Sequence, residues 1–257
     1  MPNGEYLRYV ALGDSQTEGM GDGDDAAGLR GFADRLAEHL AAVNPEVHYA
    51  NLAVRGRMAG QVRAGQLGPA LALRPDLATV VAGVNDLLRP RFDAVAVAGH
   101  LEEMFAALTA AGAHVVTVTF PDMGEIAPLA RPLASRVSDL NTRIRAAAAR
   151  HGVTVAEIGR HPVATDPRLW TADRLHASPV GHARIAAALA QAIGLPGSDD
   201  SWTLPLPPRR LPGRRQAAIA ELRWVAGFLG PWIGRRLRGR SSGDGRTAKR
   251  PELLPLD

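Results

Sequence analysis

The chain has no cysteine, which excludes disulfide bonds, thiolate catalysis and zinc sites built from cysteine. It also has no apolar run near the roughly 20 residues that a membrane-spanning helix needs. Its first five residues, Met-Pro-Asn-Gly-Glu, lack the basic and apolar regions of a secretory signal peptide. With neither a signal peptide nor a transmembrane segment in the sequence, we expect a cytoplasmic protein.

Lysine is almost absent, with one Lys against 29 Arg, and the formal net charge is +4. This charge is unevenly distributed. Residues 1–195 contain 18 Arg and 20 Asp or Glu, whereas residues 196–257 contain 12 Arg or Lys and 6 Asp or Glu. The basic excess therefore lies wholly in the last segment, and the mildly acidic remainder argues against a nucleic-acid partner.

The 257 residues, 46% of them hydrophobic, are enough for one or two domains with a full core. Five apolar runs typical of strands alternate with five helical patterns. The runs are residues 9–12, 47–53, 77–82, 115–120 and 153–158, and the helical patterns are residues 31–43, 58–73, 94–111, 135–150 and 179–193. Such alternation favours an α/β fold, with a five-stranded parallel sheet between two helical layers.

Ser15 follows the first apolar run directly, in the sequence Gly-Asp-Ser-Gln-Thr-Glu-Gly that begins at Gly13. In a parallel sheet, functional residues gather just beyond the carboxyl ends of the strands. A serine at the end of a strand is more often a turn or cap residue. Here the remaining motifs favour a nucleophile, because a serine hydroxyl becomes reactive only when a base takes its proton.

Asp173 and His176 supply the matching base, three residues apart in Asp-Arg-Leu-His. We predict that His176 takes the proton of Ser15. The carboxylate of Asp173 would accept the far ring N–H, which fixes the tautomer and stabilises the imidazolium. The alternative for Asp173 is a helix cap or a surface charge.

Gly56 and Asn85 follow the second and third apolar runs, so the fold should bring them to the edge of the sheet that carries Ser15. A tetrahedral intermediate needs donors aimed at its developing oxyanion. The backbone N–H groups of Ser15 and Gly56 and the amide of Asn85 would provide three, although both residues are also common in turns.

These four motifs, in this order, resemble the SGNH hydrolases, also called the GDSL esterase/lipase family. Ser15, Gly56, Asn85 and His176 fall on the four positions that give the family its name, and Gln16 stands where the GDSL name has an apolar residue. The resemblance covers residues 8 to about 194. It implies a flavodoxin-like central sheet and a serine esterase that needs no cofactor and no metal.

The alternative to hydrolysis is O-acyl transfer at the same site, with a sugar or alcohol in place of water. A binding module without turnover is a third possibility, which the presence of every site residue disfavours. The expected partner is a small acyl ester, either an acylated sugar or a lipid-like molecule. Nothing in the loop composition selects among these substrates, or between water and an alcohol as acceptor.

Three arginines lie beside the predicted oxyanion donors and are candidates for substrate binding: Arg55 and Arg57 bracket Gly56, and Arg89 follows Asn85. Arginine suits carboxylate or phosphate groups. With 29 Arg in the chain, a chance placement at the surface is the more economical interpretation.

Residues 196–257 form a separate extension, first Pro-rich, then helical over residues 217–229, and expected to be disordered after Gly239. We expect the helix to dock its apolar face on the body. The alternative is weak peripheral contact with an anionic membrane through the basic residues. Two other motifs are discounted. The G-x-S-x-G match at residues 239–243 lacks the flanking strand and helix of a nucleophile elbow, and His182 has no metal-ligand spacing.

Overall fold

A computed structural model describes residues 6–208, 213–231, 234 and 241–256. Its centre is a six-stranded sheet in the order β7-β6-β5-β1-β4-β8. Five strands run parallel, as predicted, and buried apolar residues fill them because helices cover both faces. They are β1 (Arg8–Gly13), β4 (His48–Asn51), β5 (Leu77–Val81), β6 (His114–Val118) and β7 (Thr154–Ala156).

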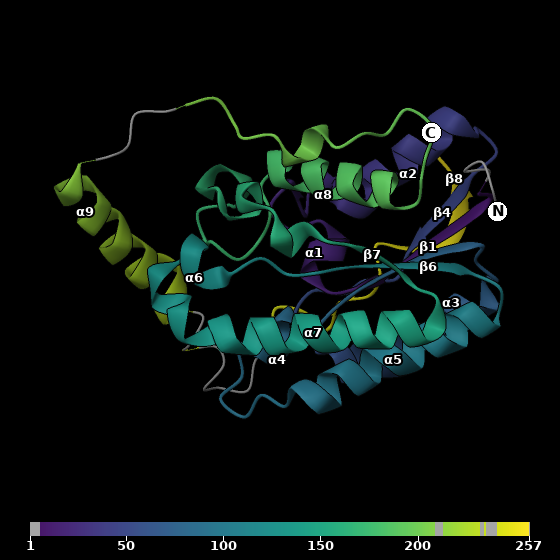
Figure 1. Cartoon of the computed structure of the whole chain (residues 1–257), viewed down its shortest axis with the longest axis horizontal. Coiled ribbons are helices and arrows are strands. Elements are labelled where there is room, and N and C mark those ends of the chain that lie inside the picture. The colour runs from purple at the N-terminus through teal and green to yellow at the C-terminus, as the bar shows by residue number, and fades with distance from the viewer. Residues whose placement is uncertain (1–5, 209–212, 232–233, 235–240, 257) are drawn as a thin grey trace.

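Long helices form a layer on each side of the sheet (Figure 1). On one side α2 (Phe32–Val43) packs against α8 (Pro179–Ala192). On the other side α5 (Ala94–Ala110) packs against both α3 (Ala59–Ala72) and α7 (Ala134–His151). The expected three-layer α/β/α architecture is therefore confirmed. No helix in the described part of the chain is long and apolar enough to cross a bilayer.

The order of the parallel strands creates a topological switch point in the sheet. In chain order they run 5-4-3-1-2 across the sheet, the flavodoxin-like arrangement. The connection that leaves β1 runs through α2, and the one that leaves its neighbour β5 runs through α5, so the two lie on opposite faces of the sheet. Ligands of open α/β sheets bind at this switch point, beyond the carboxyl ends of the strands.

The sixth strand corrects the expectation of disorder after Gly239, since residues 241–256 are ordered along the body. β8 (Arg250–Pro255) pairs antiparallel with β4, with Asn51 opposite Arg250 and Tyr49 opposite Leu254. The guanidinium of Arg250 donates to the Tyr49 carbonyl and lies over its ring. The pairing covers the backbone groups that β4 would otherwise expose as an edge strand. Gly239 and Arg240 lie outside the described residues.

The helix predicted over residues 217–229 is present as α9 (Arg214–Trp224), continued by a π-helical turn (Val225–Leu229). Its docking differs from the expectation. Leu222 is 70% exposed and Ile219 is 40% exposed, so these apolar residues do not pack on the body. Contact is made near the end of the helix, where Trp224 donates to the Asp173 carbonyl and Glu221 pairs with Arg174. Figure 1 shows the start of α9 projecting away from the domain.

Deleting residues 241–257 is expected to lower the melting temperature, by about 5–10 °C if the strand and its ion pairs contribute a few kcal/mol. The deletion would remove β8 and the pairs Arg246–Asp25 and Lys249–Asp34. Thermal unfolding followed by circular dichroism measures the shift. The exposed Glu252 provides the control, since Glu252→Ala should leave the midpoint unchanged. An unchanged midpoint in the deletion variant would show that the strand contributes nothing to stability.

Candidate active site

Ser15 begins the short helix α1 (Ser15–Glu18) immediately after β1, and its side chain is largely buried. Asp14 caps this helix by accepting a hydrogen bond from the Gln16 N–H. Gly13 is required by the tight turn, because a Cβ there would collide with Thr17 Oγ1 and the Val81 carbonyl. The strand and the cap together fix where the Ser15 hydroxyl lies.

Asp173 and His176 lie in a loop that folds back on itself, with a β-bridge between Trp170 and Ala177. The Oδ1 atom of Asp173 accepts the N–H groups of Leu175 and His176 at 2.9 and 3.0 Å. These bonds hold the carboxylate at a fixed place relative to the imidazole. The chain turns sharply here, since Arg174 has a left-handed φ of 60°.

The three predicted catalytic side chains form a continuous hydrogen-bonded chain. Nδ1 of His176 lies 2.7 Å from Asp173 Oδ2, and Nε2 lies 2.9 Å from Ser15 Oγ. Burial alone would raise the pKa of Asp173, but the hydrogen bonds and charge of His176 outweigh it and hold that pKa well below its usual range. Asp173 is thus ionised, the form that accepts the Nδ1 proton and leaves Nε2 to accept from Ser15.

Gly56 lies in the loop between β4 and α3, with a left-handed φ of 76° that favours glycine. A Cβ at this position would collide with Ser241 Oγ of the C-terminal extension. The left-handed φ therefore favours glycine at this position, and a larger residue would also require the Ser241 side chain to move. Sequence reasoning did not anticipate this contact, which places part of the discounted G-x-S-x-G segment against the predicted oxyanion loop.

Asn85 lies in the first turn of α4 (Val84–Leu87), beyond β5. Its amide Nδ2 lies 3.1 Å from Asp14 Oδ2 and 3.1 Å from the Arg57 carbonyl. The amide therefore links the segments that carry Ser15 and Gly56. Burial raises the pKa of Asp14 to about 6. An oxyanion that takes a hydrogen bond from Asn85 would replace one of these two acceptors.

Arg55, a candidate for substrate binding, forms two ion pairs within the protein. Its buried guanidinium lies 2.7 Å from Glu18 Oε1 and 2.8 Å from Asp25 Oδ1, and its backbone N–H donates to Glu18. Asp25 in turn pairs with Arg246 of the extension at 2.6 Å. These bonds tie the Gly56 loop to α1, and contact of Arg55 with substrate stays a prediction.

Arg57 and Arg89 lie on the expected loops, and both are partly buried. Arg57 follows Gly56, and its carbonyl accepts from Asn85. Arg89 follows α4, where its carbonyl accepts from Arg136. Their contact with substrate stays a prediction.

His182 is a packing residue, in line with its sequence context. Its Nδ1 accepts from the Phe32 N–H at 3.1 Å and its Nε2 donates to the Met20 carbonyl at 3.0 Å. Burial lowers the pKa of His182 to about 4, so the ring is neutral near pH 7. Among the residues that the structure describes, no group of three His, Asp or Glu side chains is placed to hold a metal ion.

The sequence profile of the GDSL-like lipase/acylhydrolase family matches residues 11–184. No curated protein sequence matches the chain.

Several solved structures share the fold. One is the lipase/acylhydrolase from Enterococcus faecalis, with 24% identity, a TM-score of 0.61 and coverage of 73% of this chain and 95% of the other. Another is Axe2, an acetylxylan esterase from Geobacillus stearothermophilus, with 18% identity, a TM-score of 0.64 and coverage of 78% and 100%. The two alignments include almost all of each solved structure but leave about a quarter of this chain unmatched.

Proposed function

The chain belongs to the GDSL-like lipase/acylhydrolase family and is an ester hydrolase, and from this premise we propose that it works through an acyl-enzyme on Ser15. The observation that carries the proposal is the hydrogen-bonded chain from Ser15 Oγ through His176 to Asp173, at 2.9 and 2.7 Å. These lengths are within the range of a nucleophile that hydrogen-bonds to its base.

In the first half of the reaction, Ser15 Oγ attacks the ester carbonyl carbon while His176 Nε2 takes its proton. The carbonyl oxygen becomes an oxyanion, which the backbone N–H groups of Ser15 and Gly56 and the Asn85 amide would stabilise. Collapse of this intermediate breaks the bond to the alcohol oxygen, which leaves with the proton from His176. The product is the acyl-Ser15 ester and a free alcohol.

In the second half, His176 takes a proton from a water molecule that attacks the acyl-Ser15 carbonyl. The tetrahedral intermediate then collapses, Ser15 regains its proton from His176, and the carboxylic acid leaves. Asp173 stays ionised throughout and stabilises the imidazolium that forms twice in each cycle.

The test is hydrolysis of p-nitrophenyl butyrate by the purified chain, with release of p-nitrophenolate followed by absorbance and acid products by mass spectrometry. We expect one butyric acid for each p-nitrophenolate released. The same reaction is repeated with xylose or glycerol at high concentration, and hydrolysis of acetylxylan, the substrate named for the Geobacillus enzyme, is measured as well. A butyryl sugar or butyryl glycerol as the main product would identify an acyltransferase, and the absence of p-nitrophenolate release would contradict the esterase.

A further inference from the structure

A groove of about 350 Å³ lies directly beside the catalytic loop, with Asp173 and His176 in its lining. One wall is formed by Met123 and the 3₁₀ segment Pro128–Leu133. Trp224 and Phe228, which belong to the extension beyond the matched family region, also line the groove. Its volume is in the range of about 300–1,000 Å³ that small-molecule sites occupy.

The lining of this groove is mostly apolar, and its polar groups already have partners. Arg174 pairs with Glu221 at 2.7 Å, and its guanidinium covers the Trp224 ring at 4.9 Å. The indole N–H of Trp224 donates to the Asp173 carbonyl, and Asp173 and His176 bond to each other. A sugar would lose hydrogen bonds to water here without replacing them, which disfavours its binding.

Some apolar side chains that line the groove are exposed to solvent. Leu129 of the 3₁₀ segment is 58% exposed and Phe228 of the extension is 44% exposed. Covering such surface with an aliphatic chain removes apolar area from water on both partners, which favours binding. The groove therefore suits a flexible hydrocarbon chain, and its contact with His176 places the end of that chain beside the reacting bond.

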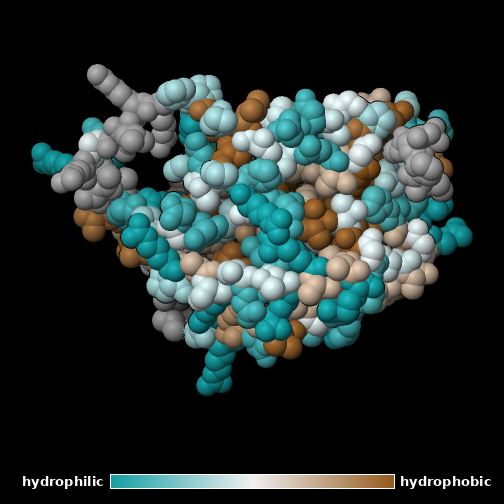
Figure 2. Space-filling model, in the orientation of Figure 1, coloured by the Kyte–Doolittle hydropathy of each residue, from teal (hydrophilic) through white to brown (hydrophobic). Residues whose placement is uncertain are grey.

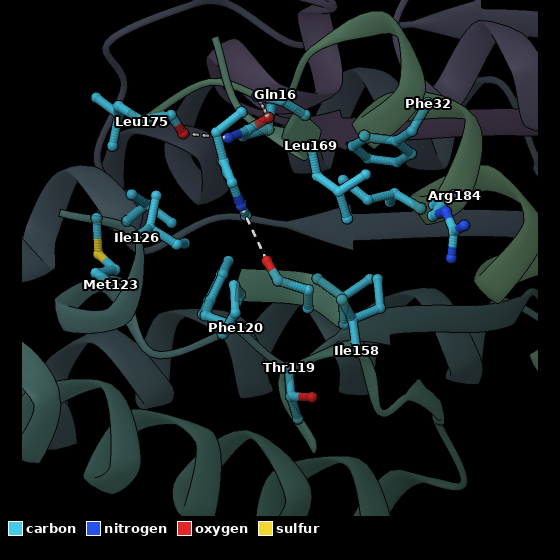
Figure 3. Close-up of a pocket in the computed structure, with 18 of the residues that line it drawn as sticks. Gln16, Phe32, Thr119, Phe120, Met123, Ile126, Ile158, Leu169, Leu175 and Arg184 are labelled. Atoms are coloured by element: carbon cyan, nitrogen blue, oxygen red, sulfur yellow. Dashed lines mark hydrogen bonds between the residues drawn. The ribbon is translucent and has the colours of Figure 1, made fainter. Parts of the chain in front are cut away.

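The apolar surface continues inward from the groove. Met123, Arg174 and Leu175 also line a second cavity, of about 70 Å³, beneath the catalytic loop. Figure 3 shows Leu175, Met123 and Ile126 gathered on one side of this cavity, with Gln16 hydrogen-bonded to the Leu175 carbonyl above it. Its other lining residues include Phe32, Phe120, Ile158 and Leu169.

We propose that this groove binds an aliphatic chain of the ester substrate, and that Trp224 and Phe228 of the C-terminal extension determine the preference for chain length. The proposal rests on the esterase function proposed above. The chain can belong to the acyl group or to the alcohol, since both leave from the same carbonyl carbon beside His176. The acyl chain and the alcohol chain are both hydrocarbons, and the experiment below distinguishes which of them occupies the groove.

The test measures binding without turnover, by titration calorimetry on the full-length Ser15→Ala protein. The probes are methyl butyrate, methyl octanoate and octyl acetate. The first two differ in acyl length, and the third carries its chain on the alcohol. We expect methyl octanoate or octyl acetate to bind at least tenfold more tightly than methyl butyrate, since each buried methylene adds about threefold to fourfold. Whichever octyl probe binds more tightly identifies the side of the ester that occupies the groove.

Second-site variants in the Ser15→Ala background test whether the preference for an octyl chain comes from the groove. Phe228→Ala and Leu129→Ala truncate lining side chains from two separate segments, and each should weaken binding of the preferred octyl probe by about threefold or more. Ala130→Trp should fill the groove and weaken binding of that probe further. Leu222→Ala is the matched control, because Leu222 is on α9 but points to solvent with 70% exposure, and it should change no affinity.

Chain-length-independent binding, or an octyl preference that Phe228→Ala and Leu129→Ala leave intact, would overturn the proposal. A concentration-dependent increase in molecular mass that these two variants abolish would assign the groove to contact with a second copy, and would overturn it as well. Failure of the esterase function gives a different result. If the wild-type protein is inactive but its Ser15→Ala variant still binds octyl esters through Phe228, the groove proposal stands and only the proposed mechanism is wrong.

Discussion

Replacement of Ser15 by alanine is expected to reduce ester hydrolysis by about 10⁴–10⁶-fold while the fold is retained. Alanine removes Oγ, which lies 2.9 Å from His176 Nε2 and is the atom that would form the proposed acyl-enzyme. The serine begins a four-residue helix whose cap comes from Asp14, so the local backbone does not depend on its hydroxyl. Initial rates with p-nitrophenyl butyrate and thermal unfolding measure the two effects.

His176→Ala should lose about as much activity as Ser15→Ala, and the double variant should be little worse than either, because the two residues act as one unit. Ser135→Ala is the matched control, since Ser135 is an exposed serine on α7 and should keep full activity. A well-folded Ser15→Ala protein with more than a few per cent of wild-type activity would place the nucleophile elsewhere.

Asp173→Asn is the second variant with a large expected effect, a loss of up to about 10⁴-fold in kcat. The side-chain oxygen that accepts the N–H groups of Leu175 and His176 would remain, so the loop should keep its shape. The second oxygen becomes an NH₂ group, which cannot accept the Nδ1 proton of His176 at its 2.7 Å separation. The imidazole would then present the wrong tautomer to Ser15.

The measurement for Asp173→Asn is kcat and KM with p-nitrophenyl butyrate, compared with Asp166→Asn. Asp166 also accepts a backbone N–H in its loop and pairs with Arg168, but it lies outside the catalytic chain. We expect kcat to fall in the first variant and to change little in the second, with similar unfolding midpoints for both. Equal kcat values for Asp173→Asn and wild type would show that the carboxylate does not orient His176.

Much of the fold follows from local sequence, because a buried parallel strand is a continuous apolar run that can be recognised without its neighbours. Residues 77–82 and 115–120 predicted β5 and β6 within one or two residues. The site was predictable for a related reason. Ser15, Gly56 and Asn85 each follow such a run, and the sheet brings the carboxyl ends of its strands together.

The features that sequence did not predict depend on contacts between distant segments. β8 contains two prolines and few apolar residues, and it forms because the edge of β4 is there to pair with. Arg55 is next to Gly56 in sequence, but only the fold places Glu18 against its guanidinium. In the same way, only the fold places the indole of Trp224 against the catalytic loop, where it donates to the Asp173 carbonyl.

Amino-acid composition alone also could not show how the polar and charged residues are distributed over the structure. Figure 2 shows hydrophilic and hydrophobic residues mixed over the visible face. The basic excess of residues 196–257 is partly used inside the molecule, since Arg246 and Lys249 pair with Asp25 and Asp34. The tail charge that suggested a membrane surface is therefore, in these two cases, involved in holding the extension to the body.

The central claim is that Ser15 forms a covalent acyl-enzyme, and trapping of that intermediate tests it most directly. The chain is treated with a p-nitrophenyl alkylphosphonate, which reacts with an activated serine but is not released by water, and the modified peptide is identified by mass spectrometry. We predict one phosphonyl group per chain, on Ser15, with loss of activity in proportion, and no labelling of Ser15→Ala or His176→Ala. Stoichiometric labelling at another residue, or full activity after Ser15 is labelled, would contradict the account.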